Sequence, residues 1–246
     1  MALKADPADQ ALLLELQALD TKLQQLGHRV STLPESAALI ALTAERDALQ
    51  RTVVEQTGQS EDAQSELKRT ESDVAVVDAR IARDTERLQA SASVKDVAAL
   101  EQELTALAKR KSDLEDIELA VMETAEERET ALATSRTALT DLDARIADAT
   151  AARDAAMGGL DDERRHADAD RATIASTVPA ELLALYEKQR ARYGVGASLL
   201  QGGVSLASGV ALNASDMSTV RSAAPDDVLL CPDSNAILVR TAESGL

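Results

Sequence analysis

The chain has 246 residues, a formal net charge of −17 and a sequence pI near 4.5. It contains no Trp, no Phe and only two Tyr. Because aromatic side chains usually dominate the energetics of a globular core, this composition excludes a large globular fold. An acidic surface repels nucleic-acid phosphates and anionic lipid, so both are disfavoured as partners. The abundance of Ala, Leu and charged residues is typical of long helices.

Cysteine usage and hydropathy indicate the compartment. Cys231 is the only cysteine, which excludes an intramolecular disulfide. The N-terminal sequence lacks the apolar core of a signal peptide, and no stretch approaches the roughly 18 apolar residues that a membrane-spanning helix needs. We therefore expect a cytoplasmic protein that does not enter a membrane.

The first segment carries the a/d stripe of a coiled coil. Proline is tolerated at the first position of a helix, so Asp6-Pro7 marks the start. Pro34 ends the stripe, because a proline disfavours the helical conformation at the residue before it. Apolar residues recur between these points in alternating steps of four and three, at Leu12, Leu16, Leu19, Leu23, Leu26, Val30 and Leu33.

Two further stripes follow, offset from the first. One runs through Leu39, Leu42, Arg46, Leu49, Val53, Gln56, Ser60, Ala63, Leu67, Thr70, Val74, Val77, Ile81, Asp84 and Leu88. The other runs through Val97, Leu100, Leu104, Leu107, Lys111, Leu114, Glu118, Val121, Ala125, Arg128, Leu132, Ser135, Leu139, Leu142, Ile146, Ala149, Arg153, Ala156 and Leu160. The sustained alternation of three and four predicts two long coiled-coil helices.

The lengths of these segments predict how they pair. Residues 6–90 and 93–176 are nearly equal in length, and a Ser-rich stretch around Ala92 separates them. We expect an antiparallel coiled-coil hairpin over residues 1–177 that turns near Ala92, with its first arm broken at Pro34. The alternative is one unbroken rod that pairs with a second copy in parallel, and it leaves the turn sequence and the matched lengths unexplained.

The C-terminal part has a different pattern. Val178-Pro179 ends the long helix, and residues 178–196 are expected to form a short helix (181–192) and a linker. Residues 197–246 contain short apolar runs at 204–206, 209–213, 228–230 and 236–239, which predict small strands, with a helical turn at 216–223. The fold class is therefore mainly α with a small C-terminal β module. A disordered tail beyond Gly194 is the alternative.

Short stretches spread over the chain carry a family resemblance. They are Ser93-Val94-Lys95-Asp96, Ser112-Asp113-Leu114-Glu115-Asp116, Val121-Met122-Glu123, Leu185-Tyr186-Glu187, Leu212-Asn213, Ala224-Pro225-Asp226-Asp227-Val228 and Ile237-Leu238-Val239-Arg240. In these the chain resembles the bacterial C4-type zinc-ribbon proteins with an N-terminal coiled-coil hairpin. The resemblance implies two C-x-x-C knuckles around a tetrahedral Zn²⁺, together with nucleic-acid or protein binding.

The zinc ligands that the resemblance implies are degenerate here. The four positions are occupied by Ser205, Ser208, Cys231 and Ser234. A neutral hydroxyl is a poor zinc ligand compared with a thiolate, so we predict no metal and no other cofactor. Asp233 beside Cys231 offers at most a weak site. His28 and His166 fall on the predicted coiled-coil helices, far along the sequence from the knuckles, and are interpreted as solvated.

Apolar packing is expected to replace the missing metal. A zinc ribbon draws much of its folding free energy from the ion, so a module without it needs another source. The expected replacement core is formed by Leu206, Val210, Leu230 and Leu238, in contact with Leu182, Leu185 or Tyr186 of the short helix.

No catalytic motif is present, so the chain is not expected to be an enzyme. We expect a non-catalytic adaptor or scaffold, monomeric or weakly oligomeric, that binds protein partners through the coiled-coil arms and the C-terminal module. The alternative is a nucleic-acid-binding regulator, which the resemblance implies, although the charge of −17 disfavours it. Its contacts would be Lys188, Arg190, Arg192, Tyr186 and Tyr193, a cluster that also fits a solvated helix end with favourable cations.

Overall fold

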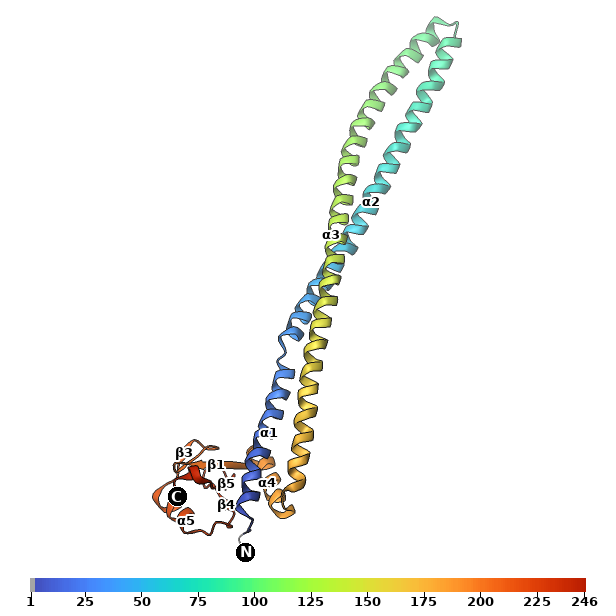
Figure 1. Cartoon of the computed structure of the whole chain (residues 1–246). Helices are drawn as coiled ribbons and strands as arrows, with labels where there is room; N and C mark the ends of the chain where they lie inside the picture. Colours follow the sequence, from blue (N-terminus) through green and yellow to red (C-terminus); the bar gives the residue numbers. More distant parts are fainter. Residues whose placement is uncertain (1–2) are drawn as a thin grey trace. The chain divides into compact units, whose positions relative to one another are not determined.

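The computed structural model describes residues 3–246 (Figure 1). The chain forms two compact units. One unit comprises the N-terminal segment up to Ser36 together with Ala152–Leu246, and the other comprises Ala37–Ala151. This grouping differs from the three segments expected from the sequence (1–177, 178–196 and 197–246). It differs because the first helix packs with the C-terminal sheet.

The helices are α1 (Pro7–Ser31), α2 (Pro34–Ala90), α3 (Val94–Thr177), α4 (Ala180–Tyr193) and α5 (Ala214–Ser222), followed by the short η1 (Ala242–Ser244). The Asp6 carboxylate caps α1 by accepting a hydrogen bond from the Ala8 N–H at 2.8 Å. The predicted break at Pro34 is confirmed, because Thr32 and Leu33 separate α1 from α2. None of the helices described within residues 3–246 is both long and apolar enough to cross a membrane.

Within the unit Ala37–Ala151, α2 and α3 lie antiparallel and are joined by residues 91–93 (Figure 1). Ion pairs link the two helices, including Arg80 with Glu103, Lys111 with Asp78 (2.6 Å) and Arg46 with Asp143 (3.3 Å). The chain therefore folds back on itself as predicted, and the alternative of one unbroken rod is wrong.

The predicted seam positions agree closely with the observed burial. Every position of the stripe in α2 is buried or half-buried, and in the longer stripe of α3 only Arg128 is exposed. The Arg128 guanidinium instead donates to the Gln59 side-chain oxygen at 3.0 Å. The buried seam of α2 includes the small or polar residues Ser60, Ala63 and Thr70. These bury less apolar surface than leucine, so each such layer contributes less to stability.

The hairpin predicts cross-linking within one chain. In an otherwise unmodified Cys231→Ser background, Arg46→Cys and Asp143→Cys should be joined intramolecularly by a short bis-maleimide, because the native side chains approach to 3.3 Å. The measurement is the mobility and mass of the product. Arg46→Cys with Glu103→Cys is the control and should not cross-link, since Glu103 pairs with Arg80 elsewhere along the hairpin. Products that join only different chains would contradict the antiparallel fold.

The C-terminal module is built on a five-stranded sheet. Its strands are β1 (Ala197–Gln201), β2 (Val204–Ser205), β3 (Val210–Ala211), β4 (Leu229–Leu230) and β5 (Ile237–Val239). Their order is β3-β2-β1-β5-β4, with β1 and β5 parallel and the other pairs antiparallel. The segment beyond Gly194 is thus folded, and the alternative of a disordered tail is wrong. The central strand β1 was not predicted from the sequence.

Two apolar clusters hold the module. The first joins α1 and α4 to the sheet through Leu13, Leu16, Val178, Leu182, Tyr186, Ala197, Val228, Ile237 and Val239. The second lies inside the module and consists of Leu200, Leu212, Val220, Cys231 and Leu238. N-terminal residues add to the first cluster by pairing with the segment before β4, where the Ala5 N–H donates to the Asp226 carbonyl at 2.9 Å.

The predicted replacement core is wrong in three of its four members. Leu206, Val210 and Leu230 are 57%, 51% and 42% exposed, and only Leu238 is buried. Leu206 lies in the turn after the two-residue strand β2, and Val210 lies on the edge strand β3. The apolar burial comes instead from the unpredicted strand β1, through Leu200, and from α5, through Val220.

Candidate functional site at the junction of α1, α4 and the sheet

The connection between α4 and β1 is held by α1. Helix α4 ends at Gly194, whose φ of +84° is the left-handed conformation that glycine adopts most easily. Two residues later, the Gly196 N–H donates to the Gln17 side-chain oxygen at 2.7 Å, and the Ala197 N–H approaches the same atom at 3.4 Å. A single glutamine on α1 therefore sets where the central strand of the sheet begins.

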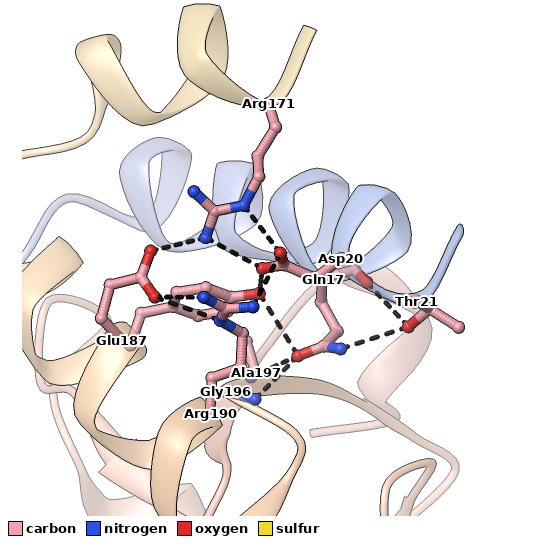
Figure 2. Close-up of polar contacts among 9 residues, drawn as sticks. Gln17, Asp20, Thr21, Arg171, Glu187, Arg190, Gly196 and Ala197 are labelled. Atoms are coloured by element: carbon pink, nitrogen blue, oxygen red, sulfur yellow. Dashed lines mark hydrogen bonds and ion pairs between the residues drawn. The ribbon is translucent and has the colours of Figure 1, made fainter. Parts of the chain in front are cut away.

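Asp20 is the buried centre of a partly exposed ionic cluster that ties three helices together (Figure 2). Its side chain is 5% exposed and accepts hydrogen bonds from the Tyr186 hydroxyl at 2.6 Å, Arg171 Nε at 2.7 Å and Arg190 Nη1 at 3.1 Å. Both guanidinium groups also donate to Glu187, at 2.5 Å from Arg171 and 2.9 Å from Arg190. The cluster joins α1, the end of α3 and α4.

The positive and negative side chains of the cluster balance one another. Burial and the bond to the Asp20 carboxylate raise the pKa of Tyr186, which keeps the phenol protonated as a donor. The bond to Asp20 raises the pKa of Arg171 in spite of its burial. Burial alone would raise the pKa of Glu187, but the two guanidinium groups outweigh it and hold that pKa below its usual range. Each charge is thus offset by a partner, as expected of a structural network.

The cluster corrects part of the predicted contact patch. Tyr186 is fully buried, so the prediction that its side chain contacts a partner is wrong. Arg190 is bound to Asp20 and Glu187 but keeps 38% of its side chain exposed, and its contact with a partner stays a prediction. The physical reason is the helical period, which places position 186 on the same face as the buried Leu182. Lys188, Arg192 and Tyr193 are exposed and remain a predicted patch, with the Arg192 guanidinium 5.3 Å from the centre of the Tyr193 ring.

A groove of about 630 Å³ lies beside the cluster, between α1, strand β1 and the turn after β2. Leu14, Leu199 and Leu206 give it apolar walls, and Lys22 adds a positive charge. Sequence reasoning missed this groove because its two walls are brought together only by tertiary packing. No signal in the sequence marked it, because Leu206 was expected in the core and its exposure is seen only in the folded module. The complete lining is Leu14, Gln17, Ala18, Thr21, Lys22, Gln25, Val195, Ala197, Ser198, Leu199, Leu206 and Ala207.

The four positions that correspond to zinc ligands hold one thiol and three hydroxyls, and the absence of zinc stays a prediction. Ser205 and Cys231 are fully buried, whereas Ser208 and Ser234 are half-buried. One thiol with three hydroxyls lacks the thiolate and imidazole donors that hold structural zinc. Within residues 3–246, no three His, Cys, Asp or Glu side chains come together as metal ligands would. Asp233, His28 and His166 are all exposed.

Gly196 is a position where a side chain has no room. A Cβ built there would lie 2.5 Å from Cε2 of the buried Tyr186 ring. We expect Gly196→Ala to lower the free energy of unfolding by about 1–3 kcal/mol through overpacking. Gly27→Ala is the matched control, because nothing lies within 4 Å of its Cβ and alanine is favoured in a helix interior. Denaturant unfolding measures both, and an equal response of the two variants would contradict the contact with Tyr186.

These features define a class of protein, in which an N-terminal helix before a long helical hairpin packs on a small C-terminal sheet. The profile of the CT398-like coiled coil hairpin domain matches residues 16–194, and the chain belongs to this family. The coiled-coil part of the resemblance is thereby confirmed, whereas a C4 zinc ribbon is not shown by the match.

Relatives extend over nearly the whole chain. The uncharacterized protein Rv2229c of Mycobacterium tuberculosis is 35% identical over 97% of this chain and 98% of its own length. A solved structure from Mycobacterium smegmatis is 33% identical, with a TM-score of 0.85, covering 97% of this chain and 100% of that one. The structure of CT398 from Chlamydia trachomatis, 20% identical with a TM-score of 0.65, covers 95% and 98% and shows the fold alone.

Proposed function

We propose that the protein is a non-catalytic adaptor that binds an apolar segment of a protein partner in the groove between α1, strand β1 and the turn after β2. The observation that carries the proposal is Leu206, which is 57% exposed at the wall of a groove of about 630 Å³. An apolar wall next to polar residues is typical of a surface that another protein covers. Lys22 in the same lining favours an acidic residue beside the apolar anchor.

The chemistry of the surrounding residues supports a binding role rather than a catalytic one. The charged groups of the Asp20 cluster are all engaged with one another, as a structural network requires. The Cys231 thiol is fully buried, so it is not accessible as a nucleophile. An adaptor does not need the Asp20 cluster or the Cys231 thiol to react. It needs a groove of constant shape, and the neighbouring Asp20 cluster holds the helix that forms one wall of the groove.

The coiled-coil unit offers a second surface for an adaptor. Leu119 and Met122 are 61% and 40% exposed on α3, and their spacing of three residues puts them on one helical face. Exposed leucine and methionine are costly to keep in water and favourable to cover. We include this pair in the proposal as the contact made by the arms.

A photo-activated cross-linking residue placed at Leu206 of the full chain tests the groove. Leu230 is the matched control, since it is a leucine of the same module that is 42% exposed but does not line the groove. The proposal expects a discrete protein product from position 206 in cells of the native host, and none from position 230. Equal products from both positions, or a product containing only nucleic acid, would contradict it.

One observation favours the nucleic-acid alternative. Lys188 and Arg192 are exposed one helical turn apart, next to the exposed ring of Tyr193. Filter binding of single-stranded RNA to the full chain at low salt separates the two functions. The adaptor proposal expects no salt-dependent binding. Binding that is lost in Lys188→Ala/Arg192→Ala, and kept in Lys109→Ala/Arg110→Ala, would favour the alternative.

A further inference from the structure

One face of α1 forms a long wall of the groove. Its lining residues share this face because they recur in steps of three and one, at Leu14, Gln17, Ala18, Thr21, Lys22 and Gln25. At a rise of 1.5 Å per residue, the wall is about 16 Å long, or about three helical turns. The opposite face of the helix carries the buried Leu13, Leu16 and Asp20, which are packed or bonded within the same unit. The groove therefore follows a face of α1 that the rest of the unit does not fully cover.

The second wall of the groove has no free strand edge. Strand β1 is paired with β2 on one side and with β5 on the other. In the turn after β2, the Leu206 N–H donates to the Leu199 carbonyl at 3.1 Å, and the Ala207 N–H donates to the Ser198 hydroxyl at 2.7 Å. An extended peptide would need free groups of this kind to pair with its own N–H and carbonyl groups. The groove therefore favours an occupant whose backbone hydrogen bonds are internal, as those of an α-helix are.

The lining is mainly apolar and carries one positive charge. Among the described residues that line the groove, Lys22 is the only charged one, and it is exposed. The chain as a whole has 43 Asp and Glu against 26 Lys and Arg, so the groove is opposite in sign to the overall charge. An acidic segment is attracted to this lysine and meets no carboxylate in the lining. The short side chains of Ala18 and Ala207 let a helix approach both walls closely.

We propose that the partner segment held in this groove is an acidic amphipathic α-helix. Apolar residues at positions i, i+3 or i+4 and i+7 of that helix pack on Leu14, Leu199 and Leu206, and a carboxylate at its edge pairs with Lys22. The α1 wall accommodates about three turns of the partner, which is about eleven residues. This inference rests on the proposed adaptor function and specifies the partner that the adaptor binds. It excludes an extended segment and a second copy of this chain as occupants.

Selection from a phage-displayed library of random peptides, each of about fifteen residues, tests the shape of the occupant on the full chain. Counter-selection against Leu206→Glu removes peptides that bind elsewhere, because Leu206 is 57% exposed and its replacement should leave the fold intact. The surviving sequences should combine apolar residues at helical spacing with Asp or Glu. Survivors whose apolar residues alternate with a period of two, or a selection that yields no survivors, would overturn the helix.

Fluorescence anisotropy of a selected peptide then measures each contact. Leu206→Ala should weaken binding about tenfold through lost apolar burial. Leu230→Ala is the matched control and should change nothing, because this exposed leucine of the same module does not line the groove. A proline in the middle of the peptide should weaken binding about a hundredfold, since it breaks a helix. Equal binding of the proline peptide would overturn the helical occupant.

A charge exchange tests the pairing with Lys22. Lys22→Glu should weaken binding of the acidic peptide about threefold, and a peptide with lysine in place of its acidic residues should then bind this variant better than it binds the unmutated chain. Lys109→Glu is the control, because Lys109 is an exposed lysine of α3 outside the groove. An equal response of the Lys22 and Lys109 variants would overturn the assigned contact.

Failure of the helix and failure of the adaptor function give different results. A discrete protein product cross-linked to position 206, together with selected peptides that bind in extended form, would overturn the helix and keep the adaptor. Helical peptides that bind, without any protein product in cells, would overturn the adaptor and keep the preference of the groove. A dimer of the full chain that is lost in Leu206→Glu, as measured by sedimentation, would identify a second copy as the occupant and overturn the inference.

Discussion

Replacing Asp20 with asparagine is expected to lower the free energy of unfolding of the unit that contains α1 and the C-terminal sheet by about 3–5 kcal/mol. The change removes the acceptor shared by Tyr186, Arg171 and Arg190, whereas Asp20 itself is 5% exposed. A desolvated charge that loses a partner still bears the free-energy cost of leaving water. It no longer gains the attraction to the opposite charge that offset this cost. Glu187 remains bound to both arginines, but these bonds join only α3 and α4, so the ionic tie to α1 is lost.

Tyrosine fluorescence measures this effect, because the chain has no tryptophan and Tyr186 is one of two tyrosines. In a Tyr193→Phe background the signal reports on Tyr186 alone, at the centre of the cluster. Asp143→Asn is the control, since its ion pair with Arg46 joins side chains that are 53% and 39% exposed and is worth about 0–1 kcal/mol. A loss in Asp20→Asn no larger than in the control would show that the cluster does not stabilise the junction.

The same cluster predicts the direction of the pH dependence. The pKa of Glu187 is held below its ordinary value by Arg171 and Arg190 once its burial is outweighed. A carboxylate whose pKa is lower in the folded state than in the unfolded state stabilises the fold fully at a pH above the unfolded-state pKa. That stabilisation is lost as the pH falls through the folded-state pKa. Stability should therefore fall below about pH 4, and less steeply in Glu187→Gln, as followed by denaturant midpoints.

The second large effect is expected for Leu200→Ala, at about 2–5 kcal/mol. Leu200 is fully buried in the cluster with Leu212, Val220, Cys231 and Leu238, so its truncation leaves a cavity inside the module. Leu230→Ala is the control in the same module, because a leucine that is 42% exposed loses little burial when shortened and should change stability by about 0.5 kcal/mol.

Amide exchange over the strands of the module distinguishes the two variants. Leu200→Ala should release protection throughout β1, β2 and β5 while the helical signal of the coiled-coil hairpin stays intact, because that signal comes from other helices. Equal losses in the two variants would mean that Leu230 is buried and that the packing of the module is different from the one described.

The helical part of this protein could be predicted from the sequence because coiled-coil geometry is local and periodic. The stripe in α2 coincides with its buried face at every position, and the breaks at Pro34 and around Ala92 lie where the helices end. A helix face is set by the 3.6-residue period, so burial follows from spacing alone. Asp20 marks the limit of this rule, as it is a buried carboxylate that no apolar spacing could indicate.

The junction was decided by contacts between residues that are far apart in the chain. Strand β1 lies parallel to β5, with Ala197 opposite Ile237, and a five-residue strand has too little pattern to be recognised before its partner is known. Gln17 holds Gly196, and Asp20 holds Tyr186, across more than a hundred and sixty positions. Such contacts depend on how α1 and α4 pack against the sheet, because a buried hydrogen bond forms only where the tertiary fold brings donor and acceptor together.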